Sequence, residues 1–290
     1  MDRVLAVDIG GTKMAAGIVT AAGELVDRRQ VATVPGGDAE ALWAPLAEMV
    51  REVVAGAEVL AVGVGSGGPM ARGGETISPL NIPGWREFPL RSRLAELVGL
   101  DVFVDNDAKA LALAEGWIGA ARGEANFIAM VVSTGVGGGI VLDGRLLDGA
   151  AGNAGHIGHV IVEPDGFTLP DHAQGVLEGE ASGTAIRAIT GRPAAEADAA
   201  TIARTGTLVG RGVASVCNLL DLRLAVVAGS VALGFGEPFF RAAQAEIDRR
   251  CLLDHSRGSR IIPAGLGDEG PLVGAAAVAW RALGHDIGIR

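Results

Sequence analysis

Short apolar runs alternate with helix-like patterns along the chain, and glycines mark many of the breaks between them. The apolar run Val4–Asp8 is followed by Gly10 and Gly11 and then by a second apolar run. The same order returns at Ile128–Ser133, where the glycines between 135 and 139 precede another apolar run. Both stretches are typical of β-hairpins with glycine-rich turns. Because they lie far apart in the chain, they predict two related lobes rather than a short-period repeat array.

Helical and strand patterns fill most of the remaining chain. Helix-like periodicity covers Ala39–Val54, Arg91–Val98, Leu208–Leu220, Pro238–Arg250 and Pro271–Leu283. Buried-strand patterns cover Val59–Gly65, Val102–Val104 and Leu224–Ala228. Strands that alternate with helices predict an α/β fold. The stretch Glu163–Gly179 has no clear periodicity.

Composition and charge exclude several classes of partner. The 290 residues are 49% hydrophobic and 20% charged, which is ordinary for a folded soluble protein. The net charge is −10 and basic residues form no run, which argues against nucleic acid or an anionic membrane as the main partner. The two cysteines form neither a disulfide framework nor a metal-binding spacing. No apolar stretch reaches membrane-spanning length, so we expect a cytoplasmic protein.

The first glycine-rich turn carries a phosphate-binding pattern. Asp8 ends a strand, and Gly10 and Gly11 then allow successive N–H groups to point at one concavity. Thr12 adds a hydroxyl donor and Lys13 adds a positive charge. Asp8 is placed to hold a hydrated Mg²⁺ beside phosphates. The alternative is a tight hairpin turn with a capping aspartate.

The second turn strengthens this interpretation. Thr134, Gly135 and Gly137 lie between two strands, so the two lobes could clamp a triphosphate from opposite sides. Other nucleotide motifs fail: there is no P-loop sequence, and the G-x-G-x-x-G pattern at 63–68 is followed at once by Pro69 instead of a helix.

The candidate catalytic residue is Asp107. It follows the short strand Val102–Val104 and opens a helical pattern over Ala108–Gly116, which is where α/β sheets place ligands. Its carboxylate could accept the proton of an attacking hydroxyl, while Asn106 holds a neighbouring hydroxyl. Asp and Asn are also favoured helix N-caps, so a purely structural role stays open.

Several motifs in the same order resemble the ROK family, which contains sugar kinases such as bacterial glucokinases together with related repressors. These motifs are Asp8–Lys13, Asn81–Trp85, Asp105–Ala108, Ser133–Gly139, Ala154–His159, Glu178 with Ser182-Gly183, Ala228–Ser230 and Gly270–Gly274. The resemblance extends from about Val4 to Ala282. Because family repressors carry an additional N-terminal helix-turn-helix and the phosphate turn here begins at Asp8, we expect a kinase rather than a repressor.

The resemblance implies an actin-like (ribonuclease H-like) two-lobed ATPase fold, with the active site in the interdomain cleft. We place the smaller N-terminal lobe at 1–106 plus 275–290, which includes a returning C-terminal helix, and the larger lobe at 107–274. The resemblance also implies ATP and Mg²⁺ as cofactors and a homodimer or larger homo-oligomer. Residues expected to bind ATP are Asp8, Gly10, Gly11, Thr12, Lys13, Thr134, Gly135, Gly137, Gly229 and Ser230. Those expected to bind the sugar are Gly68, Asn81, Asn106, Asp107, His156, His159 and Glu178, with Asp107 as the base.

The first departure from the family is its zinc motif, Cys-x-Cys-Gly-x-x-Gly-Cys, which falls here on Leu169–Val176 and has lost all three cysteines. We therefore expect no structural zinc, because one histidine cannot hold it alone. A substitute set from His156, His159, Asp171 and His172 is the alternative. We expect apolar packing through Phe167, Leu169, Val176 and Leu177 to hold this loop instead.

The second departure is His156, which replaces a glutamate that contacts sugar hydroxyls in the family. A neutral imidazole offers one acceptor and one donor instead of two anionic oxygens. We therefore predict an ATP-dependent kinase for a hydroxyl, the primary 6-hydroxyl by family analogy, of a modified hexose or a hexose-like cyclitol. The alternatives are a glucokinase proper, in which His156 preserves the contact, and a non-catalytic sugar-binding member of the family.

Overall fold

The computed structural model describes residues 1–170 and 172–290, which form two compact α/β units. The first unit comprises Met1–Gly123, Arg145–Ala154 and Leu266–Arg290. The second comprises Glu124–Gly144 and Gly155–Gly265. The chain therefore leaves the first unit and returns to it twice. These divisions lie elsewhere than the expected boundaries at 106/107 and 274/275.

The first unit is built on a sheet with strand order β3-β2-β1-β4-β5. Its strands are β1 (Arg3–Ile9), β2 (Lys13–Thr20), β3 (Leu25–Ala32), β4 (Val62–Ser66) and β5 (Val102–Asn106). β1, β2 and β3 pair in antiparallel fashion, whereas β1, β4 and β5 run parallel. The parallel register aligns Asp8 with Gly65 and Gly65 with Asp105. Their carboxyl ends therefore meet at one edge of the sheet.

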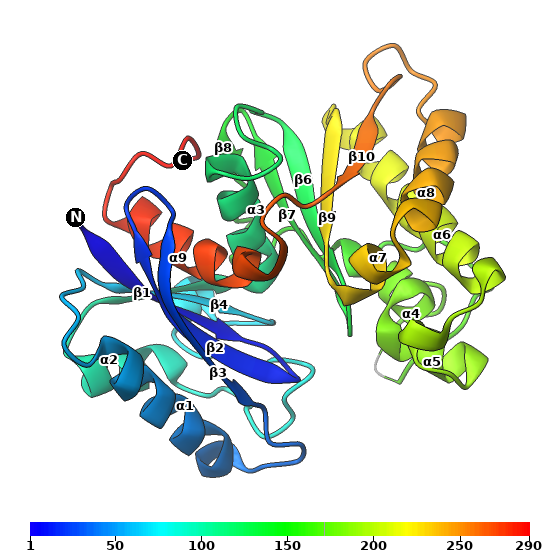
Figure 1. Cartoon of the computed structure of the whole chain (residues 1–290). Helices are drawn as coiled ribbons and strands as arrows, with labels where there is room; N and C mark the ends of the chain where they lie inside the picture. Colours follow the sequence, from blue (N-terminus) through cyan, green and yellow to red (C-terminus); the bar gives the residue numbers. More distant parts are fainter. Residues whose placement is uncertain (171) are drawn as a thin grey trace. The chain divides into compact units, whose positions relative to one another are not determined.

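Helices cover both faces of this sheet. α1 (Ala39–Val54) and α2 (Leu90–Val98) lie on one face, and α3 (Asp107–Trp117) and α9 (Gly270–Ala282) lie on the other (Figure 1). The side chain of Asp38 caps α1 by accepting two backbone N–H bonds, and α2 ends where Gly99 adopts φ 71°. Trp85 and Phe88 stack with ring centroids 4.3 Å apart in the core beneath α1.

Close packing of α9 explains why α3 belongs to the first unit. α9 presents small residues to the sheet, and a Cβ atom at Gly63 on β4 would lie 1.9 Å from the carbonyl oxygen of Ala275. α9 in turn packs along α3. Glu115 of α3 is fully buried and accepts a hydrogen bond from the Leu266 N–H at 3.2 Å. These contacts hold α3 to α9 and to the residues that precede α9. The expected boundary at 106/107 would have placed α3 in the other lobe.

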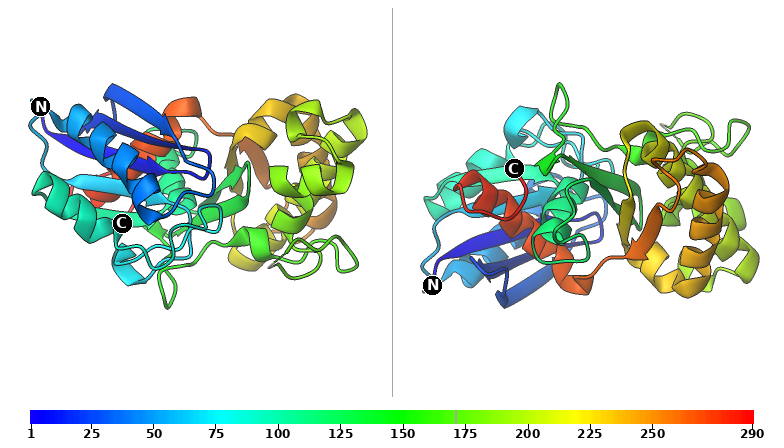
Figure 2. Two further views of the ribbon diagram at one scale, coloured as in Figure 1. Left: turned by 90° about the horizontal axis from the view of Figure 1, so that it is seen from below. Right: turned by 90° about the horizontal axis from the view of Figure 1, so that it is seen from above.

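The second unit contains a sheet with strand order β10-β9-β6-β7. Its strands are β6 (Phe127–Val132), β7 (Val136–Leu142), β9 (Leu224–Ala228) and β10 (Arg260–Pro263). Its helices are α4 (Leu177–Ala181), α5 (Gly183–Thr190), α6 (Ala199–Leu220), α7 (Ser230–Phe235) and α8 (Glu237–Arg250). α6 and α8 lie side by side over the sheet in both views of Figure 2. The two-residue strand β8 (Arg145–Leu146) falls in a segment of the first unit.

Several predicted elements have different bounds in the structure. α1 and β9 agree with the prediction. α6 begins nine residues before the predicted Leu208, because Asp198 caps it through the Thr201 N–H. β4 begins at Val62 rather than Val59. The second glycine-rich turn is shorter than predicted: Val132 pairs with Val136, so Gly137–Gly139 lie inside β7.

The loop that precedes α4 has a more polar framework than predicted. Leu169, Val176 and Leu177 are buried as expected, whereas Phe167 is 38% exposed. The buried carboxylate of Glu180 accepts a hydrogen bond from the Phe167 N–H and pairs with Arg204. Arg211 bonds Glu163 at 3.0 Å and the Val162 carbonyl at 2.6 Å. The loop is therefore held by ion pairs as well as by apolar packing.

Within residues 1–170 and 172–290, none of the helices has the length and apolar character needed to cross a membrane.

Candidate active site

The turn between β1 and β2 is held by its own backbone and by Thr33, which follows β3. The Gly10 N–H donates to the Lys13 carbonyl at 3.1 Å, and the Thr33 hydroxyl donates to the Gly10 carbonyl at 2.7 Å. The Thr33 N–H also donates to the Thr12 carbonyl at 3.0 Å. Gly11, Thr12 and Lys13 are exposed. The turn thus exposes a glycine, a hydroxyl-bearing residue and a lysine to solvent.

Gly11 brings this turn against a segment seventy residues away in sequence. A Cβ atom at Gly11 would lie 2.7 Å from Cβ of Asn81, so only glycine allows this approach. The Asn81 side chain is exposed beside the turn. The neighbouring Leu80 N–H donates to the Gly68 carbonyl at 3.2 Å, which places Gly68 in the same region.

Asp8 and Asp107 lie close together at the carboxyl edge of the sheet. A Cβ atom at Gly65 would lie 3.8 Å from a carboxylate oxygen of Asp8 and 3.7 Å from Cα of Asp107. Removal from water raises the pKa of Asp8 to about 7, and the charge of Asp107 adds to the rise, against the opposing effects of Lys13 and Arg28. A bound cation would favour the ionised form of Asp8.

The structure at the start of α3 is compatible both with a helix-capping role and with a functional role for Asn106 and Asp107. The side-chain oxygen of Asn106 accepts the N–H groups of Ala108 at 3.0 Å and Lys109 at 3.3 Å, so Asn106 is the N-cap. Its amide also donates to the Ser66 carbonyl at 3.5 Å. One carboxylate oxygen of Asp107 accepts the Ala108 N–H at 2.8 Å. Both side chains are half-buried and are oriented by these local bonds.

The network of ion pairs and hydrogen bonds around Lys109 was not predicted from the sequence. This side chain is 2% exposed and its ammonium bonds Asp105 at 2.8 Å, Asp148 at 2.7 Å and the Gly152 carbonyl at 3.2 Å. Asp105 also accepts the Asn106 N–H at 2.8 Å. The network therefore braces the start of α3 against the 145–154 segment.

The second unit carries the other glycine-rich turn. Its Thr134 carbonyl accepts the hydroxyl of Thr184 at 2.9 Å. The Ser133 hydroxyl lies 2.9 Å from that of Ser230, which begins α7. Gly229 adopts φ 101°, a backbone conformation that other residues rarely adopt. The turn and the Gly229-Ser230 segment are thereby held together.

Three further residues gather beside this turn. One carboxylate oxygen of Glu178 accepts the Val136 N–H at 2.6 Å, immediately after Gly135. The rings of His156 and His159 are 5.9 Å apart and nearly perpendicular. Desolvation and then the charge of His159 lower the pKa of His156, against the opposing effect of Glu178. His156 is therefore a neutral imidazole near pH 7.

The predicted site residues thus form one group in each unit. The group at the sheet edge of the first unit is Asp8, Gly10, Gly11, Thr12, Lys13, Gly68, Asn81, Asn106 and Asp107. The group around the second turn is Thr134, Gly135, Gly137, His156, His159, Glu178, Gly229 and Ser230.

The residues present do not fit the zinc site of the family. In the part of the chain that the structure describes, no group of three or more His, Cys, Asp or Glu side chains is arranged to hold a metal ion. Asp171, a member of the alternative ligand set, lies outside the described residues. The two cysteines are buried elsewhere in the second unit, and burial raises the pKa of Cys217 to about 11.

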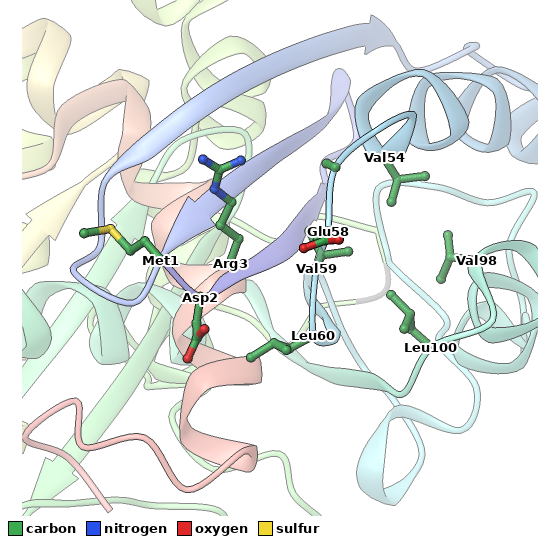
Figure 3. Close-up of a pocket in the computed structure, with 10 residues that line it drawn as sticks. Met1, Asp2, Arg3, Val54, Glu58, Val59, Leu60, Val98 and Leu100 are labelled. Carbon is green, nitrogen blue, oxygen red and sulfur yellow. The ribbon is translucent and has the colours of Figure 1, made fainter.

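A surface pocket of about 440 Å³ lies away from the predicted residues. Arg3, which begins β1, lines it, whereas Asp8 lies at the other end of the same strand (Figure 3). Its remaining lining is Met1, Asp2, Val54, Ala57, Glu58, Val59, Leu60, Val98 and Leu100. None of the candidate site residues borders this pocket.

Known proteins resemble the chain over most of its length. The glucokinase of Thermotoga maritima is 40% identical over 187 residues, which are 64% of this chain and 59% of that protein. The N-acetylmannosamine kinase of Yersinia pseudotuberculosis is 37% identical over 81% of this chain and 86% of its own length. A ROK family glucokinase from Streptomyces griseus, solved with glucose and AMPPNP, is 31% identical with a TM-score of 0.82. That match covers 94% of this chain and 98% of the solved one.

These matches agree with the architecture described above. The mixed α/β structure with two sheets is the actin-like, two-lobed ATPase fold of the solved ROK kinases. The model of the ROK family matches residues 4–282, nearly the whole chain. The chain therefore belongs to the ROK family.

Proposed function

We propose that this protein is an ATP-dependent kinase that phosphorylates a hydroxyl, by family analogy the 6-hydroxyl, of a hexose or hexose-like molecule. Proteins similar to it include a glucokinase and an N-acetylmannosamine kinase, which makes a sugar the expected acceptor. The observation that carries the proposal is the grouping of Asp8, Asp107, Asn81 and the glycine-rich turn at one sheet edge.

In the proposed reaction, the two glycine-rich turns bind the nucleotide. Backbone N–H groups at Gly10 and Gly11, the Thr12 hydroxyl and the Lys13 ammonium suit phosphate oxygens. Thr134, Gly135 and Gly137 offer the same chemistry in the second unit, and Gly229 with Ser230 would lie beside the adenosine.

Asp8 suits a hydrated Mg²⁺. Its carboxylate is half-buried, and removal from water raises its pKa, so a divalent cation would offset an unfavourable negative charge. When bound, Mg²⁺ would neutralise charge on the phosphate oxygens.

Asp107 is proposed to accept the proton of the attacking hydroxyl. Its bond to the Ala108 N–H orients the carboxylate, and a carboxylate oxygen is a suitable acceptor for a hydroxyl proton. Phosphoryl transfer depends on positioning and charge stabilisation more than on a strong base, so an oriented carboxylate suffices.

Each unit offers candidate partners for the hydroxyls of the acceptor. Gly68, Asn81 and Asn106 from the first unit, with His156, His159 and Glu178 from the second, offer amide, imidazole and carboxylate partners for hydroxyls. Because His156 is neutral, it cannot reproduce the two anionic acceptors of a glutamate. We therefore propose that a modified sugar, such as an amino or deoxy sugar, is preferred over glucose.

The test is a panel of hexoses, amino sugars, N-acetylated amino sugars, deoxy sugars and cyclitols assayed for acceptor-dependent ADP release. We expect release with ATP and Mg²⁺, and a higher kcat/KM for a modified sugar than for glucose. The highest kcat/KM on glucose would support a glucokinase proper. Sugar binding by calorimetry without ADP release would support the non-catalytic alternative and overturn the kinase.

Assembly as a homodimer or larger homo-oligomer is also proposed, from the family resemblance. Sedimentation velocity of the purified protein would measure it directly, and a single species with the mass of one chain, 29.3 kDa, would contradict it.

A further inference from the structure

His172 makes two hydrogen bonds in the loop where the family carries its zinc motif. Its Nδ1 lies 2.9 Å from the Pro170 carbonyl, which can only accept, so Nδ1 carries a proton. Its Nε2 lies 2.6 Å from one carboxylate oxygen of Glu178, so this hydrogen bond requires a second proton, shared between the ring and the carboxylate. The side chains of His172 and Glu178 are only 13% and 16% exposed. A short bond between largely buried partners is a strong restraint on the carboxylate.

Glu178 is restrained at both oxygens. The oxygen that does not face His172 accepts the Val136 N–H at 2.6 Å. Val136 begins β7 directly after the second glycine-rich turn, and Glu178 lies in the first turn of α4. The carboxylate therefore joins three segments of the second unit: the loop, the helix and the turn.

The rest of the loop is closed by bonds that need no metal. The Val162 and Glu163 N–H groups donate to the Gly175 carbonyl at 2.9 and 3.1 Å, and the Gln174 amide donates to the Gly166 carbonyl at 3.1 Å. The His172 ring stacks on that of His159 with centroids 5.5 Å apart and planes 20° apart. His172 thus links the loop to a second candidate sugar-binding residue.

We propose that His172 is a positioning residue that takes over the structural role of the absent zinc and holds the Glu178 carboxylate in place for the sugar. The loop is closed by an imidazole–carboxylate pair and by backbone bonds rather than by a metal. The part of this inference that concerns sugar binding rests on the proposed kinase function.

The orientation of the Glu178 carboxylate matters because its lone pairs have fixed directions. A carboxylate offers about four lone-pair sites, and the bonds to His172 and Val136 occupy one on each oxygen. The remaining sites point in directions set by those two bonds. Loss of the His172 bond frees the side chain to rotate, which weakens acceptor binding without removing the carboxylate itself.

Two variants separate this role from simple packing. His172→Phe keeps a ring that can stack on His159 but removes both nitrogen atoms, whereas His172→Gln keeps an amide donor for Glu178. We expect His172→Phe to raise KM for the best acceptor of the panel by about tenfold or more, with KM for ATP within about twofold of the wild type. His172→Gln should recover part of the loss.

Gln174→Ala is the matched control, because it breaks a different side-chain bond of the same loop and leaves Glu178 untouched. It should leave KM for the acceptor unchanged. An acceptor KM in His172→Phe equal to that of the wild type, or an equal rise in Gln174→Ala, would overturn the positioning role.

The proposal that the loop is held without zinc can be tested on the wild-type protein. We expect substoichiometric zinc by elemental analysis after expression with added zinc. The melting temperature should be unchanged by a zinc-selective chelator. One zinc per chain, together with a chelator-induced fall in melting temperature, would overturn the replacement of zinc by His172.

If no acceptor is phosphorylated, the kinase proposal fails, but the restraint of Glu178 by His172 can still be tested. Amide hydrogen exchange measures it without a substrate. His172→Phe should speed exchange of the Val136 amide, which donates to Glu178, while Gln174→Ala should not. Unchanged protection of Val136 in His172→Phe would contradict the restraint on Glu178. If His172→Phe fails to fold, the same measurement is made on His172→Gln. Because this variant restrains Glu178 more weakly than the wild type, its Val136 amide should exchange faster than in the wild type.

Discussion

Asp107 lies near enough to Asp8 for its charge to raise the pKa of that carboxyl, although the two residues belong to different elements. Burial is the larger cause, and together burial and the Asp107 charge bring the pKa of Asp8 to about 7 from its ordinary value of 3.8. Gly65 lies between them, with room for a Cβ atom and little more. Two carboxylates at one sheet edge are costly for the fold, which is typical of functional sites.

This arrangement predicts how stability depends on pH in the absence of ligands. The folded state holds the Asp8 proton up to about pH 7, while the unfolded chain releases it near pH 3.8. The unfolded state therefore binds fewer protons in that window, and the Asp8 contribution to the free energy of unfolding falls as pH rises, by at most about 1.4 kcal/mol per unit. Urea titrations of Asp8→Asn should show a flatter pH dependence between pH 4 and 7. If the free energy of unfolding changed with pH in the same way in Asp8→Asn and the wild type, Asp8 would not be the cause of this pH dependence.

Asp107→Asn should remove turnover and preserve the fold. The N-cap residue Asn106 is unchanged in this variant, so α3 should still form. Loss of the proposed proton acceptor should lower kcat by about a hundredfold to ten-thousandfold, with KM for the acceptor little changed. Steady-state kinetics and the melting temperature measure both effects. A variant with wild-type kcat would remove Asp107 from its proposed role.

Lys109→Met should destabilise the first unit. The substitution leaves Asp105 without its cation, and the Asp105 side chain is 11% exposed. We expect a loss of about 3 kcal/mol in the free energy of unfolding. Asp148→Asn removes the other carboxylate of the pair, but that side chain is 59% exposed, so it should cost little. Equal losses in the two variants, measured by urea unfolding, would refute this account of Lys109.

Alanine substitutions at two glycines of β4 should have different effects, because one glycine is needed for packing and the other lies in the candidate site. Gly63→Ala would place a methyl group 1.9 Å from the Ala275 carbonyl oxygen, and we expect a loss of at least about 3 kcal/mol. Gly65→Ala meets its nearest atoms at 3.6–3.8 Å, so its stability should stay within about 1 kcal/mol of the wild type. Its methyl group would nevertheless lie between Asp8 and Asp107, so kcat/KM should fall. A fully active Gly65→Ala protein would show that this space is not used.

His156→Glu should shift acceptor preference towards glucose. The change restores two anionic acceptors where the neutral imidazole offers one acceptor. We expect kcat/KM for glucose, relative to the preferred acceptor of the wild type, to rise by about tenfold. His156→Gln is the control, because it lacks the charge. An unchanged ratio in His156→Glu would show that His156 does not select the acceptor.

The sequence by itself determined the local parts of this protein. Apolar periodicity identified α1 and β9 with their observed bounds, and the Asp8–Lys13 turn was recognisable because a turn is built from adjacent residues. β3 went unrecognised because it pairs with β2 at the sheet edge and is mostly exposed, so it lacks an apolar pattern.

Only the tertiary structure decided which distant residues meet. The contacts of Gly11 with Asn81 and of Lys109 with Asp148 join segments that are distant in sequence. The contact of His172 with Glu178 joins a loop to the helix that follows it, at a spacing that carries no periodic signal. Helix and strand patterns record which face of an element is buried, whereas a polar contact depends on where the chain returns after folding. A buried lysine or a histidine that bridges a carboxylate therefore looks, in sequence, like a solvated side chain.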